Sequence, residues 1–270
     1  MCYKTLLVHL DDSQRCVVRL ALALELAERF DAHLVGLYLP MPRARTAAAD
    51  GAPGPDELRE IAQTQFLDAG ARAQRIVEWR APQPGDSPSA TLHARHADLL
   101  VLGQHDHEDP AVEPGGDFVT DLLMTAARPA IVVPYAGAFP EFAQNVLIAW
   151  DGSREAARAA SDALPLLRRA NSVSIEVVAP RGGAKRARAE EQVVDASAWL
   201  DLHGVSASFH ESAPVAGVET GTALLSHASD LHAGLIVAGA YAHSRIHERV
   251  LGGVTRTLLE AMTVPVLMSH

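Results

Sequence analysis

The residues with the clearest chemical potential lie near the end of the chain, in the stretch AGAYAHSRIHERVLGGVTR at 238–256. Gly239 follows a short apolar run, and Gly252 and Gly253 come just before a segment with helical spacing. The free backbone N–H groups and the positive dipole end of a helix bind anions. Three arginines against one glutamate give the stretch a local charge of +2. It therefore predicts a loop that holds a phosphate group.

A second candidate is an aspartate that ends the apolar run VLIAW, in the sequence DGS at 151–153. Ligands of open α/β sheets bind beyond the carboxyl ends of the strands, so this carboxylate is a candidate ligand contact. The first half of the chain has the matching sequence DDS at 11–13. A pair of carboxylates suits acid–base or metal chemistry, but a strand-to-helix cap also explains Asp12 and Ser13, and the pattern favours the cap.

Metal binding and catalysis find less support. The thirteen histidines include two suggestive pairs, His105 with His107 and His243 with His247. The sequence has no Cys-x2-Cys or His-Glu-x-x-His motif, so the pattern favours surface histidines and we assign no metal ligand. It also lacks a G-x-S-x-G elbow, a G-x4-G-K-[ST] loop and a dinucleotide fingerprint. Binding is therefore favoured over catalysis, and no catalytic residue is assigned.

The composition is that of an ordinary globular protein, with 48% hydrophobic residues, 21% charged residues and a net charge of −10. This acidic balance argues against a protein that grips nucleic acid through phosphate contacts. The apolar run before Asp11 is short, which predicts neither a signal peptide nor a membrane span. We therefore expect a cytoplasmic protein, in which Cys2 and Cys16 are reduced.

The chain repeats itself. An offset of 140 positions aligns residues 6–40 with residues 146–180 without a gap. An offset of 136 aligns residues 96–107 with residues 232–243. Repetition of this length indicates a duplicated domain. We predict two domains, at 1–138 and 144–270.

Within each half, buried apolar runs alternate with amphipathic segments. Continuous apolar runs of strand length are typical of strands buried on both faces of a parallel sheet. Five strands and four helices in each half predict an α/β fold made of two repeated three-layer α/β/α sandwich domains, each with a five-stranded parallel sheet and right-handed crossovers. The strands are expected near 5–10, 33–39, 75–80, 98–103 and 130–135, and near 146–150, 172–178, 205–210, 234–239 and 265–270.

Such a domain, with an aspartate after its first strand and a glycine loop after its fourth, resembles the universal stress protein family. Nucleotide-binding members carry the motif G-x2-G-x9-G-[ST] after strand four, and here Gly239, Ala242, Gly252 and Gly253 stand at its four fixed positions. The resemblance covers nearly the whole chain, twice, and so indicates the tandem form. It implies an adenine nucleotide alpha hydrolase-like, Rossmann-like fold and a stress-response role. It also implies ATP or AMP in the C-terminal domain, with Mg²⁺ at most as the companion of ATP.

The family also implies a role for each matching residue. Asp151 would face the ribose or the base, and Val177 or Val178 would offer backbone contacts to adenine. Gly239 would let the chain pass close to the nucleotide, and the glycine pair at 252–253 would open a helix toward the phosphates. The nucleotide-binding residues expected from the resemblance are Asp151, Val177, Val178, Gly239, Ala242, His243, Gly252, Gly253, Val254 and Thr255.

Two departures from the motif weaken this site. Alanine at position 242 costs about 1 kcal/mol if that position needs a positive φ. Gly253 in place of Ser or Thr removes a hydroxyl worth about 1 kcal/mol. Together these changes correspond to about a thirtyfold loss of affinity. The equivalent loop of the first half, at 103–118, holds five acidic residues and no Lys or Arg, so its charge opposes a phosphate and predicts no nucleotide there.

Fifth strands are edge strands, and members of this family commonly pair through them. The segments at 130–135 and 264–270 could pair in antiparallel fashion inside one chain as a pseudo-dimer, and two chains could then form a homodimer. Two alternatives to nucleotide-dependent regulation stay open. One is an interaction or chaperone-like stress protein that binds no nucleotide, and the other is a weak ATPase or hydrolase.

Overall fold

The structure is a computed structural model that describes residues 2–40, 53–82, 87–105, 118–177, 184–210, 218–240 and 253–270. The chain forms two compact units, Cys2–Arg128 and Pro129–His270. The sequence repeat predicts domains at 1–138 and 144–270, and these boundaries stay a prediction.

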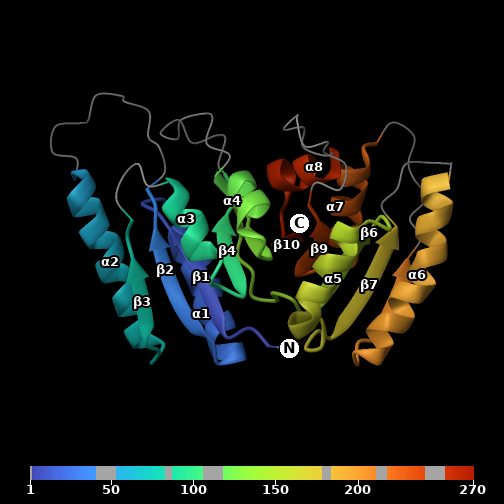
Figure 1. Cartoon of the computed structure of the whole chain (residues 1–270), viewed down its shortest axis with the longest axis horizontal. Coiled ribbons are helices and arrows are strands. Elements are labelled where there is room, and N and C mark those ends of the chain that lie inside the picture. Colours follow the sequence, from blue (N-terminus) through green and yellow to red (C-terminus); the bar gives the residue numbers. More distant parts are fainter. Residues whose placement is uncertain are drawn as a thin grey trace. The chain divides into compact units, whose positions relative to one another are not determined.

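The first unit is a parallel sheet with helical crossovers (Figure 1). Its strands lie in the order β3-β2-β1-β4, and each neighbouring pair is parallel. The strands are β1 (Thr5–Leu10), β2 (His33–Tyr38), β3 (Val77–Arg80) and β4 (Leu99–Gly103). The helices are α1 (Cys16–Phe30), α2 (Pro55–Arg72), α3 (Ser87–Ala94) and α4 (Phe118–Ala126).

The second unit contains the fifth strand of the first half as well as the whole second half. Its strands lie in the order β5-β10-β9-β6-β7-β8. They are β5 (Ala130–Val133), β6 (Asn145–Trp150), β7 (Ser172–Val177), β8 (Ala207–His210), β9 (Leu235–Gly239) and β10 (Val266–Ser269). The helices are α5 (Arg154–Leu167), α6 (Ala184–Leu202), α7 (Thr220–Asp230) and α8 (Gly253–Ala261).

The two fifth strands pair as the sequence predicted. β5 and β10 run antiparallel, with Ile131 opposite Leu267, and both of these side chains are fully buried. The remaining strand pairs of the second unit are parallel. Because β6, β7 and β8 follow one another in one direction and β9 and β10 lie on the other side of β6, right-handed crossovers place α5 and α6 on one face and α7 and α8 on the other. The predicted α/β architecture is confirmed.

The repeat needs one gap, contrary to the prediction that a single offset of 140 covers residues 6–40. β6 follows β1 by 140 positions, but β7 follows β2 by 139, since Thr5 pairs with His33 and Asn145 pairs with Ser172. A strand shifted by one residue would turn every side chain to the opposite face. The segment that leads from the first strand to the second is therefore one residue shorter in the second half.

A serine side chain caps the first helix in only one of the two halves. Ser153 caps α5, and its Oγ accepts a hydrogen bond from the N–H of Ala156 at 3.1 Å. The side chain of Ser13 makes no such cap at α1, because its hydroxyl donates to Oδ1 of Asp11 at 2.6 Å. The expectation that Ser13 caps its helix is therefore wrong.

None of the helices in the described part of the chain is long and apolar enough to cross a membrane.

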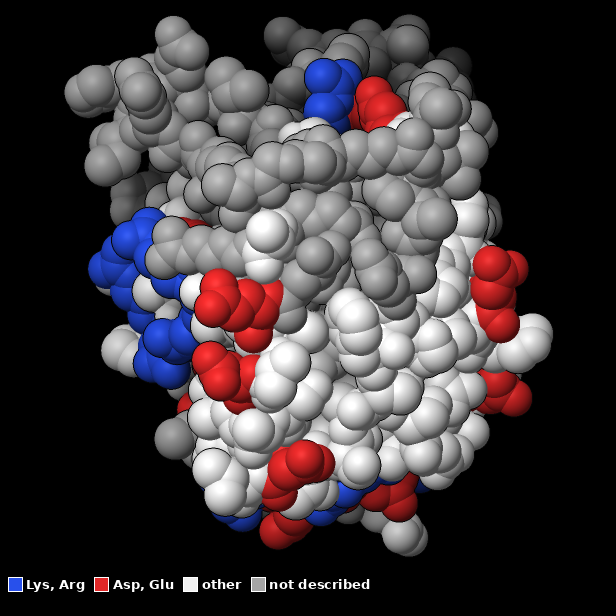
Figure 2. Space-filling view, turned by 90° about the vertical axis from the view of Figure 1, so that its right-hand side faces the viewer, with Lys and Arg blue, Asp and Glu red and all other residues white. Residues whose placement is uncertain are grey.

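Figure 2 shows acidic side chains spread over one face of the molecule, with most of the Lys and Arg side chains of that view gathered at its margin. Over the described residues of this face, large uncharged areas separate the charged groups.

Candidate functional site

The strands of the second unit bring three of the predicted residues to one edge of the sheet. Trp150 at the end of β6 lies opposite Val177 at the end of β7, and Ala149 of β6 lies opposite Ala238 of β9. Asp151 comes directly after Trp150, and Gly239 comes directly after Ala238. Parallel strands share their carboxyl edge, so Asp151, Val177 and Gly239 meet where open α/β sheets bind ligands.

Asp151 is held by a tight turn. Its Oδ1 accepts a hydrogen bond from the backbone N–H of Ser153 at 3.0 Å, and Gly152 between them has a φ of +73°. A positive φ is readily adopted only by glycine. The carboxylate is partly exposed and forms no ion pair with any residue that the structure describes. It is therefore fixed in place and has hydrogen-bonding capacity left for another molecule.

Position 239 requires glycine because of packing within the protein. A Cβ at this position would lie 2.6 Å from the backbone N of Ala156 and 2.6 Å from the carbonyl carbon of Glu155. Contacts this short do not occur, so β9 approaches the first turn of α5 too closely for any side chain. Close packing of strand and helix is sufficient to require this glycine, and its proximity to a nucleotide stays a prediction.

The start of α8 also belongs to this edge. β9 and β10 are parallel, so the intervening helix runs back against them and begins beside their carboxyl ends. Gly253, the first residue of α8, is exposed, and no described residue lies within 4 Å of the place where a Cβ would be. Val254 is half-buried and Thr255 is buried. The N–H groups of the first turn of α8 have no partner within the helix, as at any helix start.

Four of the predicted nucleotide-binding residues lie outside the described residues: Val178, Ala242, His243 and Gly252. The same is true of His107 and His247, and of the acidic residues in the loop of the first half. No group of three or more His, Cys, Asp or Glu side chains that could hold a metal occurs within the described ranges. For these histidines the sequence-based interpretation stands, in which no metal ligand is assigned.

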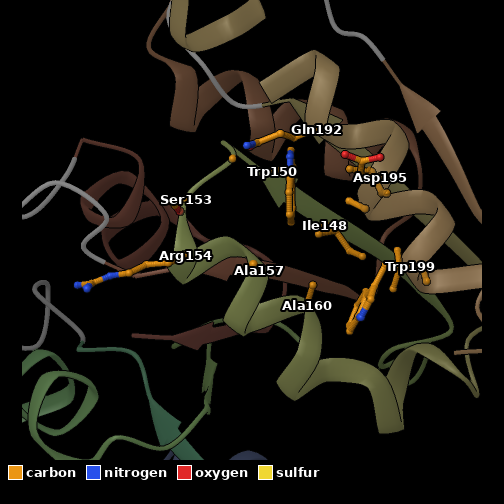
Figure 3. Close-up of a pocket in the computed structure, with 13 residues that line it drawn as sticks. Ile148, Trp150, Ser153, Arg154, Ala157, Ala160, Gln192, Asp195 and Trp199 are labelled. Carbon is orange, nitrogen blue, oxygen red and sulfur yellow. The ribbon is translucent and has the colours of Figure 1, made fainter. Parts of the chain in front are cut away.

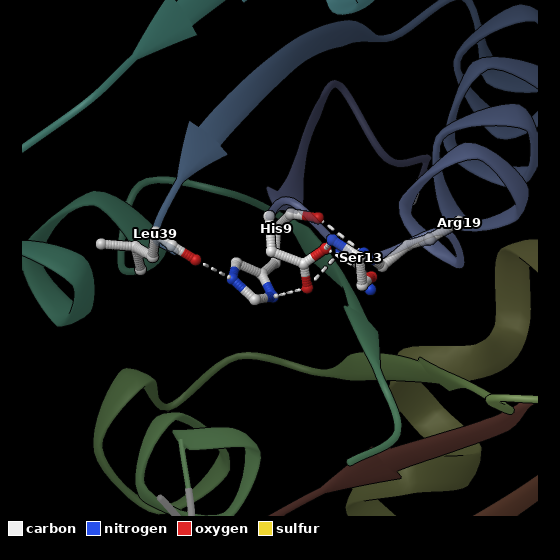
Figure 4. Close-up of polar contacts among 5 residues, drawn as sticks. His9, Ser13, Arg19 and Leu39 are labelled. Carbon is white, nitrogen blue, oxygen red and sulfur yellow. Dashed lines mark hydrogen bonds and ion pairs between the residues drawn. The ribbon is translucent and has the colours of Figure 1, made fainter. Parts of the chain in front are cut away.

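At the equivalent edge of the first unit, an arginine side chain of the protein forms an ion pair with the aspartate (Figure 4). Nη2 of Arg19 lies 2.9 Å from Oδ2 of Asp11, and both side chains are almost fully buried. Nε of Arg19 donates to the carbonyl oxygen of His9 at 2.6 Å, and Oδ1 of Asp11 accepts hydrogen bonds from the N–H and the hydroxyl of Ser13. Asp11 therefore has partners on both of its oxygens.

This environment changes the pKa of both titratable neighbours. Burial would raise the pKa of Asp11, but Arg19, His9 and the hydrogen bonds from Ser13 outweigh it and lower the pKa from 3.8 to about 2. Burial, and then the charge of Arg19, lowers the pKa of His9 from 6.5 to about 4. His9 is thus neutral at pH 7. Its Nε2 carries the proton, because that nitrogen lies 2.9 Å from the carbonyl oxygen of Leu39, which can only accept.

The two halves differ at one decisive position. Arg19 lies against Gly103, and a Cβ on that glycine would overlap its Nη1. In the second half Gly103 corresponds to Gly239, and Arg19 corresponds to Ala159, which is fully buried in α5. We did not single out Arg19 from the sequence. The signal was present, because a lone arginine stands among apolar residues in the run RCVVRLALALEL.

The comparisons with known proteins agree with this architecture. The sequence profile of the universal stress protein family matches residues 2–134 and again 143–270. A search of curated proteins finds no match. The fold is similar to that of a universal stress protein from Archaeoglobus fulgidus DSM 4304, with a TM-score of 0.72, 16% identity and coverage of 98% of this chain and 97% of that one.

Two further solved structures show the same fold over most of this chain. A protein from Pseudomonas aeruginosa UCBPP-PA14, described as a candidate universal stress protein, has a TM-score of 0.64 and 18% identity, covering 99% of this chain and 93% of that one. A functionally unknown protein from P. aeruginosa PAO1 has a TM-score of 0.63 and 16% identity, covering 99% and 92%. Structural similarity at identities this low establishes the fold only. The function has to be argued from the residues of the site.

Proposed function

The chain belongs to the universal stress protein family, and from this premise we propose that its second half binds an adenine nucleotide as a regulatory ligand while its first half does not. The nucleotide is ATP or AMP, and Mg²⁺ accompanies it only as the companion of ATP. The proposal assigns no catalytic residue, and hydrolysis of ATP is slow if it occurs.

One observation supports the proposal above the others: the contrast between Asp11 and Asp151. Both carboxylates follow the first strand of their half, and both accept a hydrogen bond from the serine two residues on, at 3.0 Å. Asp11 is neutralised by Arg19, whereas Asp151 makes no ion pair within the described part of the chain. A carboxylate of the second kind can accept hydrogen bonds from ribose hydroxyl groups.

The other groups at this edge suit the rest of a nucleotide. The backbone at 177–178 would contact adenine, and the first turn of α8, from Gly253 to Thr255, would face the phosphates. A helix start favours an anion through its dipole and its free N–H groups. The family motif adds Ala242, His243 and Gly252 to the same site.

Assembly and location complete the proposal. The chain forms a homodimer in addition to its internal pairing of β5 with β10, and it acts in the cytoplasm. Light scattering in solution would give a mass of two chains; a mass of 28.8 kDa, that of one chain, would contradict the homodimer.

Isothermal titration calorimetry with ATP and with AMP tests the central function. We expect one nucleotide per chain. The absence of binding for both nucleotides at millimolar concentration would overturn the proposal and favour an interaction or chaperone-like role for the protein.

A further inference from the structure

The second unit contains a cavity of about 470 Å³ between α5 and α6 (Figure 3). This volume lies within the range of about 300–1,000 Å³ that is typical of small-molecule sites. None of the residues predicted to bind the nucleotide lines it. The lining residues are Ile148, Trp150, Gly152, Ser153, Arg154, Ala157, Ala160, Ile175, Gln192, Asp195, Ala196, Trp199 and Leu200.

The walls of the cavity are mainly apolar. Ile148 and Ile175 belong to the faces of β6 and β7, and the side chains of Ala157 and Ala160 face it from α5. Trp199 closes the α6 side with an aromatic ring. Polar side chains contribute at a few points only, among them Gln192 and Asp195 of α6. Apolar walls with a few polar groups are typical of sites for organic molecules rather than for ions.

The indole of Trp150 carries an unsatisfied hydrogen-bond donor. Its side chain lines the cavity, the residue is 8% exposed, and its buried Nε1 has no hydrogen-bond partner among the described residues. Figure 3 shows its ring among the lining side chains, with the nitrogen toward the end where Gln192 lies. Leaving a buried N–H group without an acceptor costs about 1–3 kcal/mol. A ligand that places an acceptor beside this nitrogen recovers that free energy.

In the first unit, an aromatic ring lies at the place that corresponds to this cavity. α2 and α6 are related by 130 positions, since the N–H of Arg75 bonds to Gly70 and the N–H of Val205 bonds to Leu200 in the same way. This relation matches Ala196 with Phe66, which is 1% exposed. The ring of Phe66 lies directly over Gly36, the counterpart of Ile175. The two units therefore differ at this position: the first has the ring of Phe66, and the second has the small side chain of Ala196, which lines the cavity.

We propose that this cavity binds an uncharged, planar aromatic molecule of about two fused rings that presents a carbonyl oxygen or ring nitrogen to Nε1 of Trp150. The ring packs between the isoleucine floor and Trp199. An anionic ligand is disfavoured by Asp195, and the opposite charge of Arg154 is already paired with Glu155. The site is separate from the proposed nucleotide site, and its occupancy does not depend on nucleotide.

Coumarin, which has a carbonyl acceptor, and naphthalene, which has none, serve as matched probes. The chain has three tryptophans, so a ¹H–¹⁵N spectrum of the full protein has three indole N–H signals, which single Trp→Phe variants assign. We expect coumarin to move the Trp150 signal downfield and to leave Trp79, in the first unit, unchanged. No movement of the Trp150 signal at saturating coumarin, or an equal movement of Trp79, would overturn the proposal.

Two variants separate the parts of the inference. Trp150→Phe keeps a ring but removes the donor, so the affinity for coumarin falls about tenfold, which corresponds to 1.4 kcal/mol, while that for naphthalene stays within about twofold. Ala196→Phe fills the cavity as Phe66 does in the first unit and abolishes binding of both probes. Equal loss of both probes in Trp150→Phe, or undiminished coumarin binding in a folded Ala196→Phe protein, contradicts the assignment.

A competition experiment tests the separation from the nucleotide site. Saturating ATP leaves the affinity for coumarin unchanged if the two sites are distinct. Displacement of coumarin by ATP would show that the cavity belongs to the nucleotide site and would overturn the claim of a second ligand. This result differs from a failure of ATP to bind, which calorimetry detects on its own.

Discussion

The guanidinium of Arg19 lies 2.9 Å from the carboxylate of Asp11, and this buried ion pair closes the carboxyl edge of the first sheet. The second half keeps the aspartate as Asp151 but has Ala159 in place of the arginine. Removing one partner of a buried ion pair leaves an uncompensated charge that costs several kcal/mol. The pair therefore makes the first edge a structural element, and the second edge, without the arginine, keeps a carboxylate for a ligand.

Ala159→Arg should convert the second edge into a copy of the first. The new guanidinium would reach Asp151 as Arg19 reaches Asp11, so we expect ATP affinity to fall at least about tenfold. Calorimetry measures the affinity, and thermal unfolding checks the fold. Ala159→Met is the control for side-chain volume, because methionine is long and uncharged. Equal loss in the methionine variant would attribute the effect to overpacking and contradict the role of the charge.

Asp151→Asn should weaken nucleotide binding with little effect on stability. Asparagine keeps an oxygen to accept the hydrogen bond from Ser153, but it loses the charge that strengthens hydrogen bonds from ribose hydroxyl groups. A charged hydrogen bond contributes about 1.5–3 kcal/mol, so the dissociation constant for ATP should rise at least about tenfold. An unchanged dissociation constant would exclude Asp151 from the site.

Gly253→Ser should tighten ATP binding about fivefold, because it restores a hydroxyl worth about 1 kcal/mol at a position where no described residue would meet the new Cβ. Gly253→Ala is the matched control, since it adds the Cβ without the hydroxyl and should leave affinity nearly unchanged. Equal effects of serine and alanine would argue against a hydrogen bond from this position.

Ala242→Gly should also tighten ATP binding, by removing about 1 kcal/mol of strain from a position that needs a positive φ in the family motif. The dissociation constant measured by calorimetry should fall about fivefold. A dissociation constant that does not fall would show that this position needs no glycine.

The stability of the protein should fall in acid because of His9. Its pKa is lowered from the ordinary histidine value of 6.5 to about 4 in the folded protein. The unfolded chain therefore binds more protons between these two values, and stability decreases as pH falls from 6.5 to 4. The loss is about 3 kcal/mol. Asp11, whose pKa is lowered from 3.8 to about 2, adds a further loss as pH falls through that range.

Urea unfolding of the wild type and of His9→Gln at pH 4 and pH 7 measures the contribution of His9. Glutamine does not titrate, and it can still donate to the carbonyl oxygen of Leu39. The free energy of unfolding should therefore depend less on pH in the variant, and the difference between the two proteins should change by about 3 kcal/mol. Parallel pH profiles would contradict a buried neutral His9.

The duplication, the alternation of strands and helices and the pairing of the fifth strands followed from the sequence, because apolar runs and their spacing determine which faces are buried. The placement of Asp151 at a strand end followed for the same reason. The single-residue gap before β7 was missed, because the ungapped alignment sets Val35 and Leu37 against Ile175 and Val177, whereas the observed register sets them against Ser174 and Glu176.

Other features depend on contacts between distant segments, which the sequence pattern does not show. The nucleotide contact of Gly239 stays a prediction, and the structure adds a packing reason for this glycine, the approach of β9 to the backbone of Glu155 and Ala156. Substitutions at Gly239 would thus disturb the fold and are poor tests of binding. The ion pair of Arg19 with Asp11 and the cavity that Ala196 lines likewise depend on side chains that meet only in the folded chain.

Nucleotide binding by the second half alone is tested most directly by locating the bound nucleotide along the chain. The full protein would be photolabelled with 2-azido-ATP, digested and mapped by mass spectrometry, with unlabelled ATP as the competitor. We expect competed labelling confined to peptides from residues 144–270. Competed labelling of peptides from residues 2–128 at a similar yield would contradict this expectation, because the edge closed by Asp11 and Arg19 would then bind nucleotide as well.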